Sequence, residues 1–143
     1  MNSDALVLFG ATGDLARKKI FPAVYHLVRS GAFIGPVIGV ASRPWSDDDL
    51  RRRLRESVAE SVDDPDGAAL DAVADRLTYV SGDYRDSATF PRLAERLGDA
   101  QAKRPLFFLA VPPSFFDEVV DGLAGEGLEA GGRLVVEKPF GRD

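Results

Sequence analysis

Two glycines spaced three residues apart, Gly10 and Gly13, are the residues whose type and position most clearly suggest chemistry. They enclose the segment Gly-Ala-Thr-Gly, which lies directly between a short apolar run and a segment with helical periodicity. Glycine permits a sharp turn and lets a backbone or a ligand come close. The start of a helix has unpaired N–H groups and the positive end of the helix dipole. The spacing therefore predicts a cradle for a phosphate, of the kind that holds the pyrophosphate of a dinucleotide.

Two structural interpretations of this turn stay open at this point. Glycines often serve only the geometry of a strand-to-helix turn, and Asp14 could simply cap the helix. The third glycine of the dinucleotide fingerprint is replaced by Ala16, a residue that still allows close packing of the helix on the strand. The turn alone does not decide between a nucleotide site and a purely structural role.

A positive charge follows the second apolar run, where proteins that bind NAD usually carry an acidic residue for the ribose hydroxyls. Here the corresponding residues are Ser42 and Arg43. An arginine suits a 2′-phosphate, because a charge-assisted hydrogen bond contributes about 1.5–3 kcal/mol. We therefore expect NADP as the coenzyme, with NAD as the alternative. The competing interpretation makes Arg43 an ordinary surface arginine that pairs with the acidic residues 47–49.

Predicted strands and helices, which must position these residues, alternate along the chain. Apolar runs predict strands at 5–9, 36–41, 77–81, 106–111 and 133–137. Helical patterns predict helices at 14–30, from 46 onward, at 68–77, at 87–97 and from 114 onward. Pro22 lies inside the first helix and should bend it or make it locally irregular. The run 106–111 is continuously apolar, which is typical of a central parallel strand covered on both faces.

This alternation predicts an α/β fold, namely a Rossmann-type, doubly wound parallel sheet in three layers. Right-handed crossovers give the strand order 3-2-1-4-5. The topological switch point then lies between the first and fourth strands, so we expect residues 10–15 and 110–116 to face the ligand together.

Size and composition restrict the class of protein further. The 143 residues suit one domain, and apolar residues at 45% and charged residues at 29% are ordinary for a globular protein. The net charge of −5 argues against nucleic acid or an anionic membrane as the partner. Cysteine is absent, which excludes disulfides and thiolate metal sites. No signal peptide or apolar run of about 20 residues is present, so a cytoplasmic location is the default expectation.

Three separate motifs carry a resemblance to a known family. They are Gly-Ala-Thr-Gly-Asp-Leu-Ala-Arg-Lys-Lys-Ile-Phe-Pro at 10–22, Leu-Ala-Val-Pro-Pro at 109–113 and Val-Glu-Lys-Pro-Phe-Gly-Arg-Asp at 136–143. Their order and spacing resemble the N-terminal coenzyme domain of the glucose-6-phosphate dehydrogenase family. The last motif is highly specific, whereas Gly-Ala-Thr-Gly alone is not. The resemblance covers nearly the whole chain but less than half of a family member.

The resemblance implies a set of binding residues, which can be carried over position by position. The implied coenzyme-binding residues are Gly10, Ala11, Thr12, Gly13, Asp14, Leu15, Arg43, Ala110, Pro112, Phe116 and Lys138. Lys138 and Lys19 are implied to contact glucose 6-phosphate, and the peptide before Pro139 is a candidate for a cis bond or for switching. Without the resemblance, Lys138 would be a surface lysine and Phe116 a core residue.

Two positions depart from the family pattern. The family often has tyrosine where Phe116 stands, so a hydroxyl contact is lost. The family arginine usually follows directly after the alanine that ends the second strand, whereas here Ser42 has that place and Arg43 comes one residue later.

The family's catalytic base does not lie within these residues. It is a histidine in Arg-Ile-Asp-His-Tyr-Leu-Gly-Lys, which lies downstream of residue 143, and His26 cannot replace it. Such a base typically contributes about 10²–10⁴-fold to the rate. The resemblance thus implies that residues 1–143 form the NADP-binding domain of an enzyme that oxidises glucose 6-phosphate to 6-phosphogluconolactone in the pentose phosphate pathway. The C-terminal substrate domain is absent, so we expect this chain alone to bind coenzyme at best weakly and not to turn over the sugar.

Two alternative functions remain. One is a non-catalytic nucleotide-binding or interaction module. The other is a short-chain reductase or epimerase, but none of the three tyrosines is followed by lysine four residues later, as that class requires. Without the covering of a second domain the last strand should expose an apolar patch, which predicts self-association into a homo-oligomer.

Overall fold

A five-stranded parallel sheet forms the centre of the computed structural model, which describes residues 2–136. The strands are β1 (Ala5–Phe9), β2 (Val37–Ala41), β3 (Leu77–Ser81), β4 (Pro105–Leu109) and β5 (Arg133–Val136). Their order in the sheet is β3-β2-β1-β4-β5, and each neighbouring pair is parallel. The predicted strand order is therefore confirmed. The switch point lies between β1 and β4, as expected.

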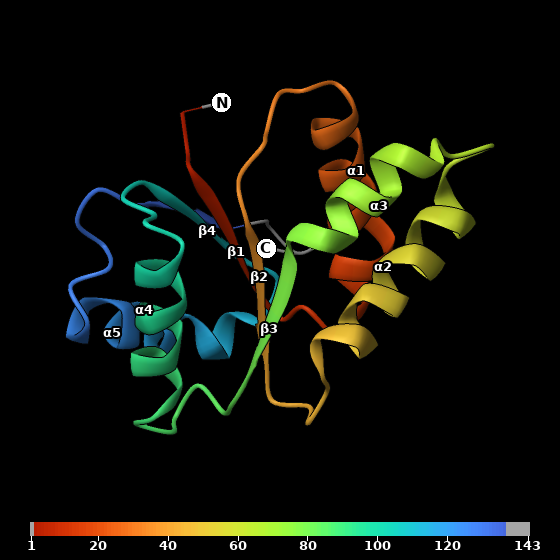
Figure 1. Cartoon of the computed structure of the whole chain (residues 1–143). Coiled ribbons are helices and arrows are strands. Elements are labelled where there is room, and N and C mark those ends of the chain that lie inside the picture. Colours follow the sequence, from red (N-terminus) through yellow and green to blue (C-terminus); the bar gives the residue numbers. More distant parts are fainter. Residues whose placement is uncertain (1, 137–143) are drawn as a thin grey trace.

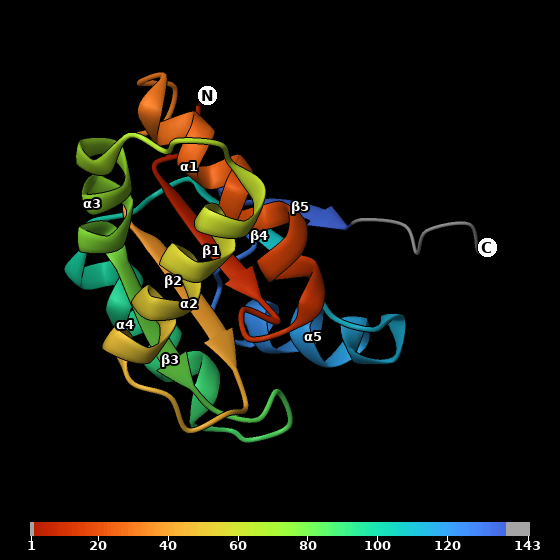
Figure 2. The same cartoon turned by 90° about the vertical axis from the view of Figure 1, so that its right-hand side faces the viewer.

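Helices cover both faces of this sheet and make three layers (Figures 1 and 2). The α-helices are α1 (Phe21–Arg29), α2 (Asp47–Ser61), α3 (Gly67–Arg76), α4 (Thr89–Asp99) and α5 (Phe116–Gly125). Helices α1, α2 and α3 lie on one side of the sheet, and α4 and α5 lie on the other. The Rossmann-type α/β prediction is confirmed in its topology and its layers.

The central strand β1 supplies both hydrophobic cores. All five of its residues are buried. Because side chains alternate across a strand, Leu6 and Leu8 enter the core under α1–α3, while Val7 and Phe9 enter the core under α4 and α5. The continuous apolar sequence of β1 is thus explained by burial on both faces.

The first helix begins with an irregular turn, as the position of Pro22 predicts. Residues 16–20 form a π-helical turn, η1 (Ala16–Ile20), which passes directly into α1. A proline has no N–H group to donate, and a wider turn is one way to accommodate it. Ala16 is completely buried in the core under α1–α3. Its small side chain provides the close helix–strand packing that the fingerprint requires.

Strand β4 differs from its prediction in length and in burial. It ends at Leu109 rather than at residue 111, and its side chains alternate between buried and partly buried. Phe107 and Leu109 are buried against α4 and α5, whereas Leu106 and Phe108 are only partly covered on the α1 side. The expected cover on both faces is therefore complete on the side of α4 and α5 and partial on the side of α1.

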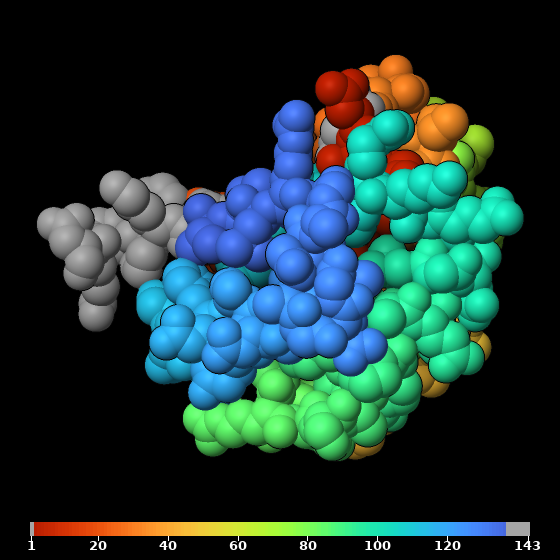
Figure 3. All heavy atoms as spheres, turned by 90° about the vertical axis from the view of Figure 1, so that its left-hand side faces the viewer, coloured from red at the N-terminus to blue at the C-terminus, as the bar shows by residue number. Residues whose placement is uncertain are grey.

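The edge strand β5 is the most exposed part of the sheet. Leu134, Val135 and Val136 are 48%, 37% and 41% exposed. Figure 3 shows this segment in deep blue at the surface beside α5. The apolar patch predicted at the last strand is thus present. None of the helices within residues 2–136 is long and apolar enough to cross a membrane.

Candidate functional site

A cleft of ≈ 240 Å³ opens at the switch point, above the C-terminal ends of β1, β2 and β4. Its walls come from the glycine turn, the end of β2, the loop after β3 and the segment after β4. The lining residues are Gly10, Thr12, Gly13, Ala41, Ser42, Asp83, Tyr84, Ala110, Val111, Pro112 and Phe115. Five of them were predicted as binding residues: Gly10, Thr12, Gly13, Ala110 and Pro112. Open α/β sheets bind their ligands at this place in the fold.

The backbone conformation of the turn requires a glycine at position 10. Its φ angle is +82°, a conformation that side chains disfavour. A Cβ at this position would also collide with the carbonyl group of Ala110. The N–H of Gly10 donates to the carbonyl oxygen of Val40 at 2.9 Å and to the hydroxyl of Tyr84 at 2.8 Å. This amide is therefore already satisfied by the protein.

Gly13 has a different role in the same turn. A Cβ there would meet only the carbonyl oxygen of Gly10, at 3.4 Å, which is an ordinary contact. Gly13 is exposed and lines the cleft. No described part of the chain fills the space beside it, so the close approach that glycine permits is left for a ligand.

The start of the first helix offers unpaired N–H groups next to the glycine turn. Within residues 2–136, the N–H groups of Thr12, Asp14 and Leu15 have no acceptor in the protein. Asp14 and Leu15 already belong to the helix, so Asp14 lies in the first turn and not at the cap position. By contrast, Ala11 is fully buried and its N–H donates to Val40 at 3.4 Å. These three free amides and the helix dipole favour an anion.

The chain after β2 is held by two hydroxyl groups from β3. The Tyr79 hydroxyl donates to the carbonyl oxygen of Arg43 at 2.6 Å, and the Ser81 hydroxyl donates to the same oxygen at 2.9 Å. Burial raises the pKa of Tyr79 to about 12, so its hydroxyl stays protonated and able to donate near neutral pH. The backbone of Arg43 is thus fixed beside Ser42, which lines the cleft.

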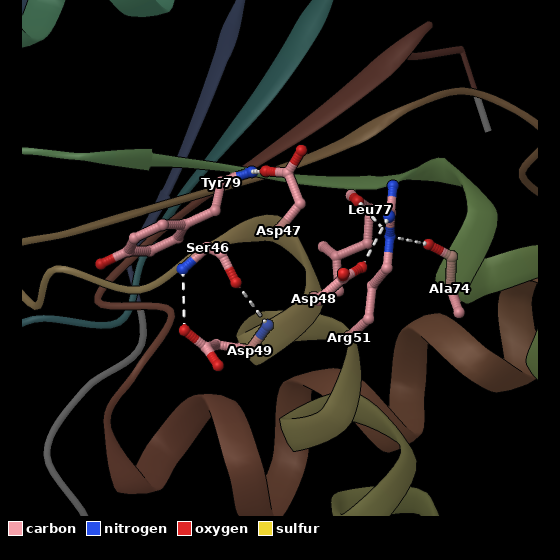
Figure 4. Close-up of polar contacts among 8 residues, drawn as sticks. All are labelled: Ser46, Asp47, Asp48, Asp49, Arg51, Ala74, Leu77 and Tyr79. Atoms are coloured by element: carbon pink, nitrogen blue, oxygen red, sulfur yellow. Dashed lines mark hydrogen bonds and ion pairs between the residues drawn. The ribbon is translucent and has the colours of Figure 1, made fainter.

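The acidic residues that could have paired with Arg43 are occupied elsewhere (Figure 4). Asp47 accepts the backbone N–H of Tyr79 at 2.7 Å. Asp48 pairs with Arg51, and Asp49 closes a capping box with Ser46 while it also pairs with Arg52. No ion pair of Arg43 occurs in the described part of the chain. The expected pairing of Arg43 with residues 47–49 is therefore wrong, although Arg43 does lie at the surface.

The guanidinium of Arg43 instead lies near an aromatic ring. Its Cζ is 6.0 Å from the centre of the Trp45 ring, and the Cζ of Arg53 is 5.5 Å from the same ring. Both cations lie within the range of a cation–π contact. Arg43 is exposed, does not itself line the cleft, and stands next to the residue that does.

On the opposite wall, the segment after β4 corrects the predicted aromatic contact. Pro113 begins a short 3-10 turn, η2 (Pro113–Phe115), before α5. Phe115 lines the cleft, whereas Phe116 packs against the core under α4 and α5. The tight turn rotates successive side chains by about 120° per residue, so neighbouring phenylalanines face different environments.

The two predicted lysines have separate outcomes. Lys19 lies in the exposed part of η1 and does not line the cleft. Lys138 and the peptide before Pro139 lie outside the described residues, so their predicted roles stay predictions. No group of three or more metal-ligating side chains is found among residues 2–136.

Two cleft residues, Asp83 and Tyr84, were missed by the sequence reasoning. They follow β3 directly, in the loop that leads to α4. Their place after a predicted strand could have revealed them, because the carboxyl ends of all parallel strands meet at one edge of the sheet. Because Tyr84 follows a predicted strand, it could have been predicted as a cleft residue together with the glycine turn.

Comparison with known proteins agrees with this geometry. Residues 7–143 match the family model described as "Glucose-6-phosphate dehydrogenase, NAD binding domain". The chain is 46% identical over 143 residues to glucose-6-phosphate 1-dehydrogenase 1 of Mycobacterium bovis, with 99% of this chain and 30% of that protein covered. It is 35% identical over 149 residues to glucose-6-phosphate 1-dehydrogenase of Bacillus subtilis, with 96% and 29% covered.

Solved structures show the same similarity. A crystal structure of glucose-6-phosphate 1-dehydrogenase from Mycobacterium avium superposes with a TM-score of 0.89 at 44% identity, covering 99% of this chain and 31% of that one. A glucose-6-phosphate dehydrogenase in complex with its substrate glucose-6-phosphate gives a TM-score of 0.78 at 31% identity, with 99% and 31% covered. The chain thus spans about 30% of the length of the curated relatives it matches.

Proposed function

Because this chain belongs to the glucose-6-phosphate dehydrogenase family, we propose that it is the part of such an enzyme that binds the dinucleotide coenzyme. The free N–H groups of Thr12, Asp14 and Leu15 carry this proposal. Thr12 lines the cleft, Asp14 and Leu15 follow it at the start of the helix, and a pyrophosphate supplies the acceptors that these donors lack. The proposed domain comprises residues 1–143.

NADP is the proposed coenzyme, with NAD as the weaker ligand. The pyrophosphate at the glycine turn places the adenosine ribose toward the end of β2. There Ser42 lines the cleft, and the exposed, positively charged Arg43 follows it without a carboxylate partner among the described residues. The nicotinamide half then extends toward Ala110 and Pro112 on the opposite wall.

The reaction proposed for the whole enzyme is oxidation of glucose 6-phosphate to 6-phosphogluconolactone in the cytoplasm. The coenzyme, when bound, accepts a hydride from the sugar. Residues 1–143 contribute the phosphate cradle, the 2′-phosphate contact and, through Lys138 and Lys19, contacts to the sugar phosphate. His26 lies in α1, away from the residues that line the cleft, so these residues provide no histidine base at the site.

Equilibrium titration of the purified chain with NADP and NAD tests this function. We expect saturable binding of NADP, followed by isothermal titration calorimetry, and at least about tenfold weaker binding of NAD, because one charge-assisted hydrogen bond is lost. Addition of glucose 6-phosphate to the NADP complex should produce no NADPH absorbance. Failure of both dinucleotides to bind at millimolar concentration would contradict the proposal.

We also expect the purified 143-residue chain to self-associate through β5. At the opposite edge of the sheet, two backbone groups of β3 are already paired, because Asp47 accepts the N–H of Tyr79 and Arg51 donates to the carbonyl oxygen of Leu77. Among residues 2–136, strand β5 pairs only with β4 and exposes Leu134, so a second copy of the chain can cover it. Sedimentation velocity should show a concentration-dependent dimer that Leu134→Lys removes.

An exposed residue elsewhere on the surface provides the control for this experiment. Ile34 is 77% exposed and precedes β2, far along the sheet from β5. Ile34→Lys adds the same charge and should leave the dimer intact. A clean monomer across the whole concentration range would refute self-association.

A further inference from the structure

The hydroxyl of Tyr84 joins three separate parts of the cleft. It accepts the N–H of Gly10 at 2.8 Å and donates to the carbonyl oxygen of Val40 at 3.1 Å. Gly10 and Tyr84 are 74 residues apart in sequence. One side chain from the loop after β3 thus ties the end of β1 to the end of β2 at the centre of the phosphate cradle.

The ring of Tyr84 is fixed from two sides. It meets Phe9 edge-on, with ring centres 5.9 Å apart, and Phe115 edge-on at 5.8 Å. The loop that carries it is anchored as well, because the Thr89 hydroxyl donates to the carbonyl oxygen of Asp83 at 2.7 Å. The hydroxyl therefore has little freedom to turn away from Gly10. Burial raises the pKa of Tyr84, so the hydroxyl remains protonated and can donate to Val40.

The amides of the turn divide between those that the protein already holds and those that remain for a ligand. The N–H of Gly10 is taken by Val40 and Tyr84, and that of Ala11 by Val40, whereas those of Thr12, Asp14 and Leu15 are left free. The Tyr84 hydroxyl is thus the second acceptor of the amide at the one residue of the turn whose φ angle is positive. Without the Tyr84 hydroxyl, Gly10 keeps only its bond to Val40, and the turn gains conformational freedom that ligand binding must then remove.

We propose that Tyr84 is a positioning residue for dinucleotide binding, whose hydroxyl holds the glycine turn in the shape that receives the pyrophosphate. It acts through Gly10 and makes no bond of its own to the phosphate. This inference rests on the proposed function, which it deepens by assigning a role that the glycine motif alone does not contain.

The test is the substitution Tyr84→Phe in the 143-residue chain. The ring contacts remain while the hydroxyl is lost, and we expect the affinity for NADP to fall about 3- to 10-fold, as for the loss of one hydrogen bond. Binding of adenosine 2′-monophosphate should be unchanged, because that probe has no phosphate at the glycine turn. In the ligand-free variant, the amide resonance of Gly10 should shift and its hydrogen exchange should accelerate.

A matched control separates positioning from general stability. The Tyr25 hydroxyl accepts the backbone N–H of Asp66 at 2.6 Å, in the layer of α1 and α3, where no cleft residue lies. Tyr25→Phe removes a comparable bond and should lower thermal stability without changing the affinity for NADP.

Two affinity results would overturn the inference, and an amide signal provides a third test. The affinity results are unchanged NADP affinity in Tyr84→Phe and an equal loss of affinity in Tyr25→Phe. The Gly10 amide signal is read without any dinucleotide. A wild-type chain that fails to bind NADP would refute the proposed function, whereas an unperturbed Gly10 signal in Tyr84→Phe would refute the positioning role by itself.

Discussion

Gly10→Ala is expected to destabilise the domain by roughly 2–6 kcal/mol, which is a large share of the stability of a domain of this size. A non-glycine residue in a sparsely populated backbone region costs about 1–3 kcal/mol. Displacing the Ala110 carbonyl, which a Cβ would hit, adds an overpacking cost of about 1–3 kcal/mol. Urea denaturation followed by circular dichroism measures the change as a lower midpoint with an unchanged slope.

Gly13→Ala provides the contrast within the same turn. Its Cβ would make only one ordinary contact, so the free energy of unfolding should change by less than about 1 kcal/mol. The added methyl group would stand at the cleft, however, where it hinders close approach of a pyrophosphate. We expect stability to be retained while affinity for NADP falls about tenfold or more. Equal destabilisation by the two substitutions would contradict these separate roles.

Arg43→Ala is expected to weaken NADP binding about 10- to 100-fold, because one charge-assisted hydrogen bond to the 2′-phosphate is lost. Affinity for NAD, which has no 2′-phosphate, should change less than about threefold. The effect on NADP should shrink as salt is added, because Arg43 is exposed and its charge is screened. Parallel calorimetric titrations with both dinucleotides measure the ratio directly.

The control for charge is Arg52→Ala. Arg52 is also exposed and lies in the same region of the chain, but it pairs with Asp49 on α2 and does not line the cleft. Its removal changes the net charge equally and should leave the preference for NADP intact. If Arg43→Ala lowers the affinity for NADP and NAD by the same factor, the proposed 2′-phosphate contact is wrong.

The elements and their order could be predicted because they depend on local patterns. The apolar run 5–9 has the length and composition of a buried strand, and it is confirmed as β1. The π-turn at Ala16–Ile20 follows from the single proline after it. The helical connections between parallel strands are almost always right-handed, and this rule leaves few possible orders of the strands in the sheet.

The end of β4 and the degree to which helices bury its two faces could not be predicted in the same way. Leu106 and Phe108 are as apolar as their neighbours, yet they are only partly buried. Burial depends on which helices lie above a strand, and α1, α2 and α3 gather on the half of the sheet that contains β1, β2 and β3. Sequence periodicity contains no information about that lateral placement.

The sequence by itself determined the fold, the family and the glycine turn, because backbone preferences and short motifs act between residues close together in the chain. Only the tertiary structure decided which amides stay free, that Tyr84 closes the turn, and that Phe115 rather than Phe116 meets the cleft. These features depend on contacts across the sheet or on the register of a single tight turn. They are fixed when distant segments pack together, and no local pattern of residues encodes them.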